Sequence, residues 1–305
     1  MTASSAPTLR LGIDLGGTKI AGIVLGPGDS VVAERRMPSP RNDYGATVRA
    51  VGEMVAALEQ DAGGSGSVGI GMPGSISPVA GSVQNANSTW LNGQPFASDL
   101  DACLRRRVRL ANDANCFALS EATDGNAAGA GTVFGVILGT GCGGGLVFGG
   151  RLVDGPNGIG GEWGHNPLPW ATPEEFPGPR CWCGRLGCLE TWISGSGLEA
   201  DYAGASGSRL PAEEVARLAV SGNGAAQSAL HRHAGRLARG LAHTVNLFDP
   251  DVVVLGGGLS NLTHLYEVLP DLMRAHIFAD APLIDIRPPR WGDASGVRGA
   301  ARLWS

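Results

Sequence analysis

Three cysteines and one histidine form the sharpest chemical pattern in the chain. Cys181, Cys183 and Cys188 lie within eight residues, and His165 precedes them. Thiolates and an imidazole are preferred zinc ligands, and the glycines between the cysteines let the backbone wrap a tetrahedral ion. Buried reduced thiols are the alternative, because a disulfide framework is rare in a cytosolic protein. We predict a structural zinc site built from these four side chains.

A glycine turn near the start of the chain has the groups that a triphosphate site needs. Gly16 and Gly17 allow the backbone to approach an anion, and their amides and the Thr18 hydroxyl can donate to phosphate oxygens. Asp14, at the end of the strand before the turn, can hold Mg²⁺ directly or through water. Lys19, the only lysine among 23 basic residues, follows the turn. A plain hairpin turn explains the same residues, so both interpretations stand at this point.

Two further glycine runs follow apolar segments. Residues 139–144 match the G-x-G-x-x-G pattern of dinucleotide sites, and Glu162 lies about 20 residues further on. That pattern must open a helix, whereas the residues that follow here favour a strand, which argues against a Rossmann site. Residues 256–258 are three glycines after an apolar strand, where a flat adenine ring could lie close or where the chain could simply turn. No Walker A sequence is present, which excludes P-loop kinases.

Acidic and amide side chains supply the candidate reaction centre. Asp113, flanked by Asn112, falls between a short strand and a helix. It could accept the proton of an alcohol that attacks a γ-phosphate, because phosphoryl transfer needs one base to orient its nucleophile. Helix capping is the alternative, since Asn and Asp are favoured N-caps. Glu162, His165 and Glu190 could bind vicinal sugar hydroxyls, although single residues of these types are more often structural.

The elements that must position these residues alternate between strands and helices. Two segments, one early in each half, read as strand, glycine turn and strand, which predicts a two-lobed α/β protein with a ligand between the lobes and a boundary near 121–131. Expected strands lie within 9–25 and at 68–72, 108–111, 132–138, 146–148 and 252–255, and expected helices at 45–60, 96–107, 115–122, 230–245 and 296–304.

Composition narrows the function classes. The net charge of −5 and the absence of a basic stripe argue against a nucleic-acid partner. Residues 1–8 are small and polar and do not resemble a signal peptide, and no apolar run of 18 residues occurs, so we expect no membrane partner and a cytoplasmic location.

These runs, in this order, resemble the ROK family of repressors, open reading frames and kinases, and the resemblance covers nearly the whole chain. It implies the actin/hexokinase/Hsp70-like ATPase fold, with two ribonuclease-H-like lobes that close on ATP and a sugar. Residues 1–121 would form the small lobe, with a helix at about 293–305 packed back on it. Residues 122–292 would form the large lobe with the zinc loop.

The resemblance also assigns roles to residues. Asp113 would be the catalytic base, and the zinc ligand His165 would turn its second ring nitrogen toward the sugar. The sugar contacts would be Gly74, Asn87, Asn112, Asp113, Glu162, His165 and Glu190. The Mg-ATP contacts would be Asp14, Gly16, Gly17, Thr18, Lys19, Gly139, Thr140, Gly141, Gly256, Gly257 and Gly258.

Within the family, residues 74–78, 85–96 and 161–170 look most like bacterial fructokinases with manno(fructo)kinase activity. The first prediction is therefore an ATP-dependent fructokinase that forms fructose 6-phosphate and works as a homodimer. N-acetylglucosamine kinase, glucokinase and mannokinase are the alternatives, and residues 112–121 are shared with N-acetylglucosamine kinases. Fifteen residues separate His165 from Cys181, a longer spacing than the family usually has, which could reshape the rim of the site.

Two alternatives come from other functional classes. A sugar-sensing repressor of the same family carries a helix-turn-helix before the first glycine turn, and only 13 residues precede Asp14 here. An Hsp70-like chaperone ATPase carries a peptide-binding domain, which we do not expect after the ATPase lobes. Sugar-independent ATP turnover would favour the chaperone.

Overall fold

The computed structural model describes residues 9–304; residues 1–8, where we expected no signal peptide, and residue 305 lie outside the described part. The chain forms two compact units. The first unit comprises Met1–Glu121, Leu152–Gly160 and Asp293–Ser305, and the second comprises Ala122–Arg151 and Gly161–Gly292. Among the described helices, none has the length and apolar character needed to span a membrane.

The sheet of the first unit is a hairpin extended by parallel strands. Its order is β3-β2-β1-β4-β7, in which β1, β2 and β3 pair antiparallel while β4 and β7 run parallel to β1. The strands expected within 9–25 and at 68–72 and 108–111 are confirmed. We did not predict β3, because its side chains are mostly exposed and carry no apolar alternation. The bounds are β1 Leu9–Leu15, β2 Lys19–Leu25, β3 Val31–Pro38, β4 Gly66–Met72 and β7 Val108–Asn112.

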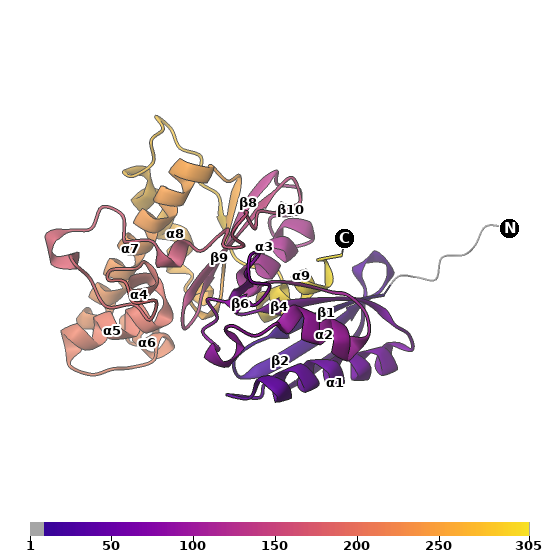
Figure 1. The fold of residues 1–305 in the computed structure, drawn as a ribbon. Coiled ribbons are helices and arrows are strands. Elements are labelled where there is room, and N and C mark those ends of the chain that lie inside the picture. Colours follow the sequence, from indigo (N-terminus) through magenta and orange to yellow (C-terminus); the bar gives the residue numbers. More distant parts are fainter. Residues whose placement is uncertain (1–8, 305) are drawn as a thin grey trace. The chain divides into compact units, whose positions relative to one another are not determined.

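Helices cover both faces of this sheet (Figure 1). α1 (Tyr44–Ala62) packs its apolar side chains on one face, starts at the N-cap Asp43 and ends at Gly63, which adopts a φ of 67°. α9 (Ser295–Ala301) lies on the opposite face, close to the backbone of β1 and β4. A Cβ atom at Gly12 would come 2.0 Å from the Val297 carbonyl oxygen, so only glycine permits this approach.

Smaller elements complete the first unit. α2 ends three residues earlier than we expected, because Arg105 adopts the left-handed conformation that terminates it. α3 begins at Asp113 itself, slightly before the expected start. The bounds are β5 Ser75–Ile76, β6 Val83–Gln84, α2 Phe96–Leu104 and α3 Asp113–Thr123.

One segment packs with the first unit although we placed it in the second lobe. Leu152–Gly160 belongs to the first unit. The side-chain amide of Asn115 donates to Asp154 Oδ1 at 2.9 Å, and that of Gln84 donates to the Asn157 carbonyl at 3.1 Å. These side-chain hydrogen bonds join the segment to the first unit, although the residues on both sides of it in the sequence belong to the second unit.

The second unit repeats the strand order of the first. Its sheet has the order β10-β9-β8-β11-β12. β9 is antiparallel to β8, β11 is parallel to β8, and β12 is parallel to β11. The strand expected at 132–138 is confirmed as β8, and the repeated strand–turn–strand pattern is confirmed by the shared order. The bounds are β8 Thr132–Leu138, β9 Cys142–Phe148, β10 Arg151–Leu152, β11 Val252–Gly256 and β12 Ile286–Arg287.

The helices of the second unit surround one long helix. α7 packs against α5, α6 and α8 (Figure 1). Many of the buried apolar residues of this unit lie on α7. It is longer at both ends than the helix expected at 230–245. The bounds are α4 Glu190–Ile193, α5 Gly195–Ser206, α6 Ala212–Val220, α7 Gly224–Phe248 and α8 His264–Arg274.

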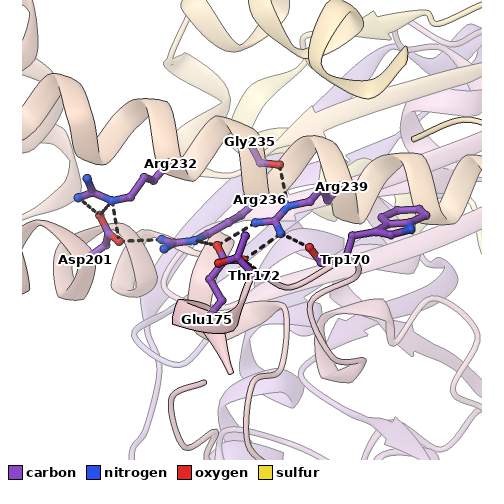
Figure 2. A network of polar contacts seen from close by, with 8 residues as sticks. All are labelled: Trp170, Thr172, Glu175, Asp201, Arg232, Gly235, Arg236 and Arg239. Carbon is purple, nitrogen blue, oxygen red and sulfur yellow. Dashed lines mark hydrogen bonds and ion pairs between the residues drawn. The ribbon is translucent and has the colours of Figure 1, made fainter. Parts of the chain in front are cut away.

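Two arginines of α7 bind the proline-rich loop that follows His165, and a third arginine joins them through an aspartate of α5. Arg232, Arg236 and Arg239 project from one side of α7 because they are spaced four and three residues apart (Figure 2). Glu175, on the loop, accepts from Arg236 at 2.8 Å and from Arg239 at 2.8 and 2.9 Å. Asp201, on α5, bridges Arg232 and Arg236. We call these five residues the α7 arginine network.

Candidate functional site

The first unit brings three predicted residues to one edge of its sheet. Asp14 stands at the carboxyl end of β1, Gly74 follows β4, and Asp113 follows β7. Because these strands are parallel, their carboxyl ends share an edge. The Asn112 amide donates to the Gly74 carbonyl at 3.2 Å and so joins two of the strand ends.

The Asp113 segment is both a helix start and a cluster of carboxylates. The Ala114 amide donates to Asn112 Oδ1 at 2.9 Å and to Asp113 Oδ1 at 2.8 Å, so the capping interpretation is correct for the first turn of α3. Burial raises the pKa of Asp113 above its usual value, although hydrogen bonds from backbone amides and Asn112 act in the opposite direction. Burial and hydrogen bonding thus act on this carboxyl in opposite directions, and burial prevails.

Asp14 lies in the field of other carboxylates. Burial and the charges of Asp113 and Asp293 raise the pKa of Asp14 to about 7, against the opposing effect of Lys19. Lys19 Nζ also pairs with Asp293 Oδ2 at 3.3 Å. Asp14 and Asp293 thus interact with Lys19, and Asp113 adds its charge to the field at Asp14. A divalent cation would stabilise such a group of carboxylates.

The glycine turn after Asp14 is a tight hairpin. The Gly16 amide donates to the Lys19 carbonyl at 3.0 Å, so this amide closes the turn. The Gly16 amide is therefore used within the hairpin, and the role of Gly16 beside a phosphate stays a prediction. Gly17 and Thr18 form the exposed tip, where their amides and hydroxyl can reach a ligand.

Asn87 lies on an exposed loop whose shape is set by Asn92. The Asn92 side chain accepts from the Ala86 amide and donates to the Ala86 carbonyl, both at 2.9 Å. Trp90, in the same loop, donates its indole N–H to Thr47 Oγ1 of α1 at 3.2 Å. The loop is thereby fixed on α1 with Asn87 at its surface.

The second unit gathers the four predicted metal ligands. The ligand atoms of His165, Cys181, Cys183 and Cys188 all lie within 4.8 Å of one another. His165 Nδ1 is 3.6 Å from Cys181 Sγ, and Cys183 Sγ is 3.6 Å from Cys188 Sγ. Tetrahedral zinc with Zn–S bonds of about 2.3 Å would separate its sulfurs by roughly 3.8 Å, so these side chains fit zinc. Since Nδ1 points into the cluster, Nε2 is the nitrogen that can serve a ligand outside it.

Two carboxylates lie beside this cluster. Glu190, the first residue of α4, accepts from the Cys142 amide at 3.0 Å through Oε2 and from the Trp182 indole at 2.7 Å through Oε1. Burial is the largest cause that raises the pKa of the Cys142 thiol, and the negative charges of Glu190 and Glu162 raise it further. The structure therefore brings together Glu162, His165 and Glu190, as the sequence predicted for a sugar site.

The two glycine runs of the second unit meet at the carboxyl ends of β8 and β11. The Gly139 amide donates to the Gly141 carbonyl at 3.0 Å and closes the first turn. A Cβ atom at Gly257, where φ is 75°, would lie 2.5 Å from the Leu138 carbonyl oxygen, so this turn runs against the end of β8. β9 follows the first turn, which confirms that the G-x-G-x-x-G run opens no helix.

Sequence reasoning missed Asp293 and Trp182. Asp293 precedes α9 at the far end of the chain, and no spacing linked it to Asp14 or Lys19. Its only signal was its place in a glycine-flanked run before a helix. Trp182 lies between two candidate metal ligands, Cys181 and Cys183. A large aromatic residue at such a turn was the signal that could have marked it as functional.

Comparisons with known proteins agree with this geometry. Residues 10–305 match the ROK family. An N-acetyl-D-glucosamine kinase from Pectobacterium atrosepticum is 43% identical over 296 residues, which cover 96% of this chain and 97% of that protein. The N-acetyl-D-glucosamine kinase of Escherichia coli O157:H7 is also 43% identical over 296 residues, covering 96% and 98% of the two chains.

Solved structures share the fold over the same extent. The ROK hexokinase from Thermus thermophilus has a TM-score of 0.85 at 34% identity and covers 96% of this chain and 97% of its own. The ROK family glucokinase from Streptomyces griseus, solved with glucose and AMPPNP, has a TM-score of 0.79 at 27% identity, with 97% and 98% covered. The fold is thus the actin/hexokinase-like fold that the sequence predicted. On this match and these similarities, the chain belongs to the ROK family.

Proposed function

We propose that this protein is an ATP-dependent kinase that phosphorylates a hydroxyl group of N-acetyl-D-glucosamine. The observation that supports this substrate is the 43% identity, over 96% of the chain, to N-acetyl-D-glucosamine kinases. Our fructose prediction depended on resemblance within 74–96 and 161–170 alone. The relatives favour the alternative that the sequence left open, so fructose becomes a secondary substrate to be tested.

Asp113 would act as the catalytic base. It would accept the proton of the sugar hydroxyl while that oxygen forms its bond to the γ-phosphorus and the bond to the leaving ADP breaks. Its position at the start of α3, with Oδ1 held by the Ala114 amide, leaves Oδ2 to meet the hydroxyl. Asn112, tied to the Gly74 carbonyl, would fix the same loop against the sugar.

The remaining predicted residues would divide the substrates between them. We assign the sugar to Gly74, Asn87, Asn112, Glu162, His165 and Glu190, in addition to Asp113. We assign the nucleotide to Asp14, Gly16, Gly17, Thr18, Lys19, Gly139, Thr140, Gly141 and the glycines at 256–258. Mg²⁺ near Asp14 would neutralise phosphate charge when it is bound.

Zinc would have a structural role in this proposal. Held by His165, Cys181, Cys183 and Cys188, it would supply the tetrahedral tie that orients the His165 ring. The close ligand atoms support this assignment. We also propose a homodimer, which light scattering coupled to size-exclusion chromatography would test.

A coupled kinase assay tests the substrate. We expect the highest kcat/KM for N-acetyl-D-glucosamine among N-acetyl-D-glucosamine, N-acetyl-D-mannosamine, glucose, mannose and fructose, with Asp113→Asn as the inactive control. A tenfold preference for fructose, equal to about 1.4 kcal/mol in the transition state, would restore the fructokinase assignment. Saturable sugar binding without turnover would instead indicate a sugar-sensing regulator, and ATP turnover without sugar would indicate a chaperone-like ATPase.

A further inference from the structure

Trp182 stands between two of the cysteines in the predicted metal cluster, and 56% of its surface is exposed. An exposed tryptophan on a tight turn loses much of the hydrophobic stabilisation that burial of its ring would provide. Packing in the core therefore does not explain this residue. Its polar and ring contacts point to another role.

The indole N–H of Trp182 fixes one oxygen of Glu190. The bond to Oε1 is 2.7 Å long, which is short for a neutral donor and typical of a charged acceptor. The other oxygen, Oε2, accepts from the Cys142 backbone amide at 3.0 Å. The Cys181 thiol adds a longer contact to Oε1 at 3.8 Å. With donors on both oxygens, the plane of the carboxylate is set, while further lone pairs remain for sugar hydroxyls.

The ring of Trp182 also sets the orientation of His165. The two ring centroids are 5.1 Å apart at an interplanar angle of 84°, an edge-to-face contact. His165 Nδ1 lies 3.6 Å from Cys181 Sγ, so the imidazole is held from the cluster side and from the Trp182 side. One side chain thus touches two of the residues that we assign to the sugar.

We propose that Trp182 is a positioning residue of the sugar site, which aligns Glu190 and His165 for the sugar hydroxyls. This inference rests on the proposed function, because that function assigns both partners to the sugar. The contacts that Trp182 aligns exist before and during the reaction. Its loss should therefore weaken ground-state and transition-state binding equally, raising the sugar KM while leaving kcat nearly unchanged.

Three variants separate the contacts. Trp182→Phe keeps the ring beside His165 and removes the N–H donor to Glu190. Trp182→Ala removes both contacts, and Trp182→His keeps a smaller ring with an N–H donor. The matched control is Leu186→Ala, because Leu186 is another exposed apolar residue of the same loop, 51% exposed. Each protein is assayed as the metal-loaded full chain for kcat, KM of sugar and ATP, sugar affinity by calorimetry, and zinc content.

We expect Trp182→Phe to raise the sugar KM and the calorimetric Kd about tenfold, the tenfold to hundredfold range being typical for the loss of a supporting contact. Trp182→Ala should raise both further, and Trp182→His should recover part of the loss. In all three Trp182 variants, the KM for ATP and the zinc content should stay at wild-type values, and kcat should stay within about threefold of wild type. The same holds for Leu186→Ala.

The outcomes distinguish this inference from the function on which it rests. If the wild-type protein phosphorylates a sugar and Trp182→Phe matches it in KM and Kd, the role of Trp182 is refuted and the kinase assignment stands. If KM rises only in proportion to lost zinc, Trp182 merely supports the metal loop and the inference is also refuted. If the wild-type protein neither binds nor phosphorylates any sugar tested, the proposed function fails first and this inference fails with it.

Discussion

Replacing Glu175 by Gln tests whether the α7 arginine network holds the proline-rich loop. Glu175 is the only carboxylate that joins this loop to Arg236 and Arg239 within the described network, and its side chain is 10% exposed. Burial opposes the charge on Glu175, but hydrogen bonds from Arg239 and Arg236 prevail and lower its pKa from 4.5 to about 2. The amide of Gln keeps the shape of the side chain and removes the charge.

The size of the effect follows from that pKa. A difference of about 2.5 units corresponds to about 3.4 kcal/mol, which solvent at the loop edge screens to about 2–3 kcal/mol. Arg236 keeps Asp201 and Arg239 keeps the Trp170 carbonyl, so the loss should stay below the 3–5 kcal/mol typical of a broken buried pair. For a unit of this size we expect the melting temperature to fall by about 5–10 °C.

Differential scanning calorimetry of Glu175→Gln and Glu174→Gln checks this reasoning. Glu174 is an exposed neighbour on the same turn, where hydrogen bonds from its own backbone amide and from the Thr172 side chain lower its pKa. Because solvent screens these contacts, its replacement should lower the melting temperature much less than Glu175→Gln does. Because the folded pKa of Glu175 is lowered, its contribution is complete above pH 4.5 and disappears as the pH falls toward 2. Equal melting temperatures for all three proteins at pH 7, or a difference that persists undiminished at pH 3, would refute the argument.

The remaining predictions concern the reaction centre and the metal. Asp113→Asn should lower kcat by about 10²–10⁴ while calorimetry shows sugar and ATP binding largely intact; unchanged turnover would leave Asp113 as a helix cap only. Metal analysis should find one zinc per chain, and removal by a chelator should weaken sugar binding, whereas a metal-free protein with freely titrating thiols would contradict the site. With Mg²⁺ limiting, activity should fall as the pH drops below about 7, where Asp14 becomes protonated, and saturating Mg²⁺ should move this inflection to lower pH. An inflection that ignores the Mg²⁺ concentration would show that another group controls it.

The sequence was most informative where a candidate functional residue directly follows a predicted strand. Asp14 and Asp113 each follow an apolar run, and parallel strands bring such ends together by construction. The metal ligands were equally readable, because three of the four are close neighbours in the chain. Both cases need only local pattern and one general rule of topology.

The parts that sequence did not reveal depend on long-range contacts. Asp293 reaches Lys19 across nearly the whole chain, and Glu175 reaches α7 from a loop whose prolines predicted only irregular backbone. β3 lies at the edge of its sheet, where most of its side chains are exposed, so its sequence shows no alternation of apolar and polar residues. The hydrogen bond from the Gly16 amide to the Lys19 carbonyl could not be predicted either, because a turn that closes on itself and a turn that binds an anion have the same composition.

The two units use one strand order for different chemistry. In the first, the parallel strands β1 and β7 end in carboxylates, Asp14 and Asp113, with Asp293 nearby and Lys19 as the one lysine. In the second, β8 and β11 end in glycine turns, which present backbone amides in place of charge. Burial and the charges of Asp113 and Asp293 raise the pKa of Asp14 to about 7, so a negative charge on this edge is unfavourable unless a cation compensates it. The glycine edge would present amides to a nucleotide without a charge of its own. In the proposed reaction, this division of charge would favour Mg-ATP over ATP alone.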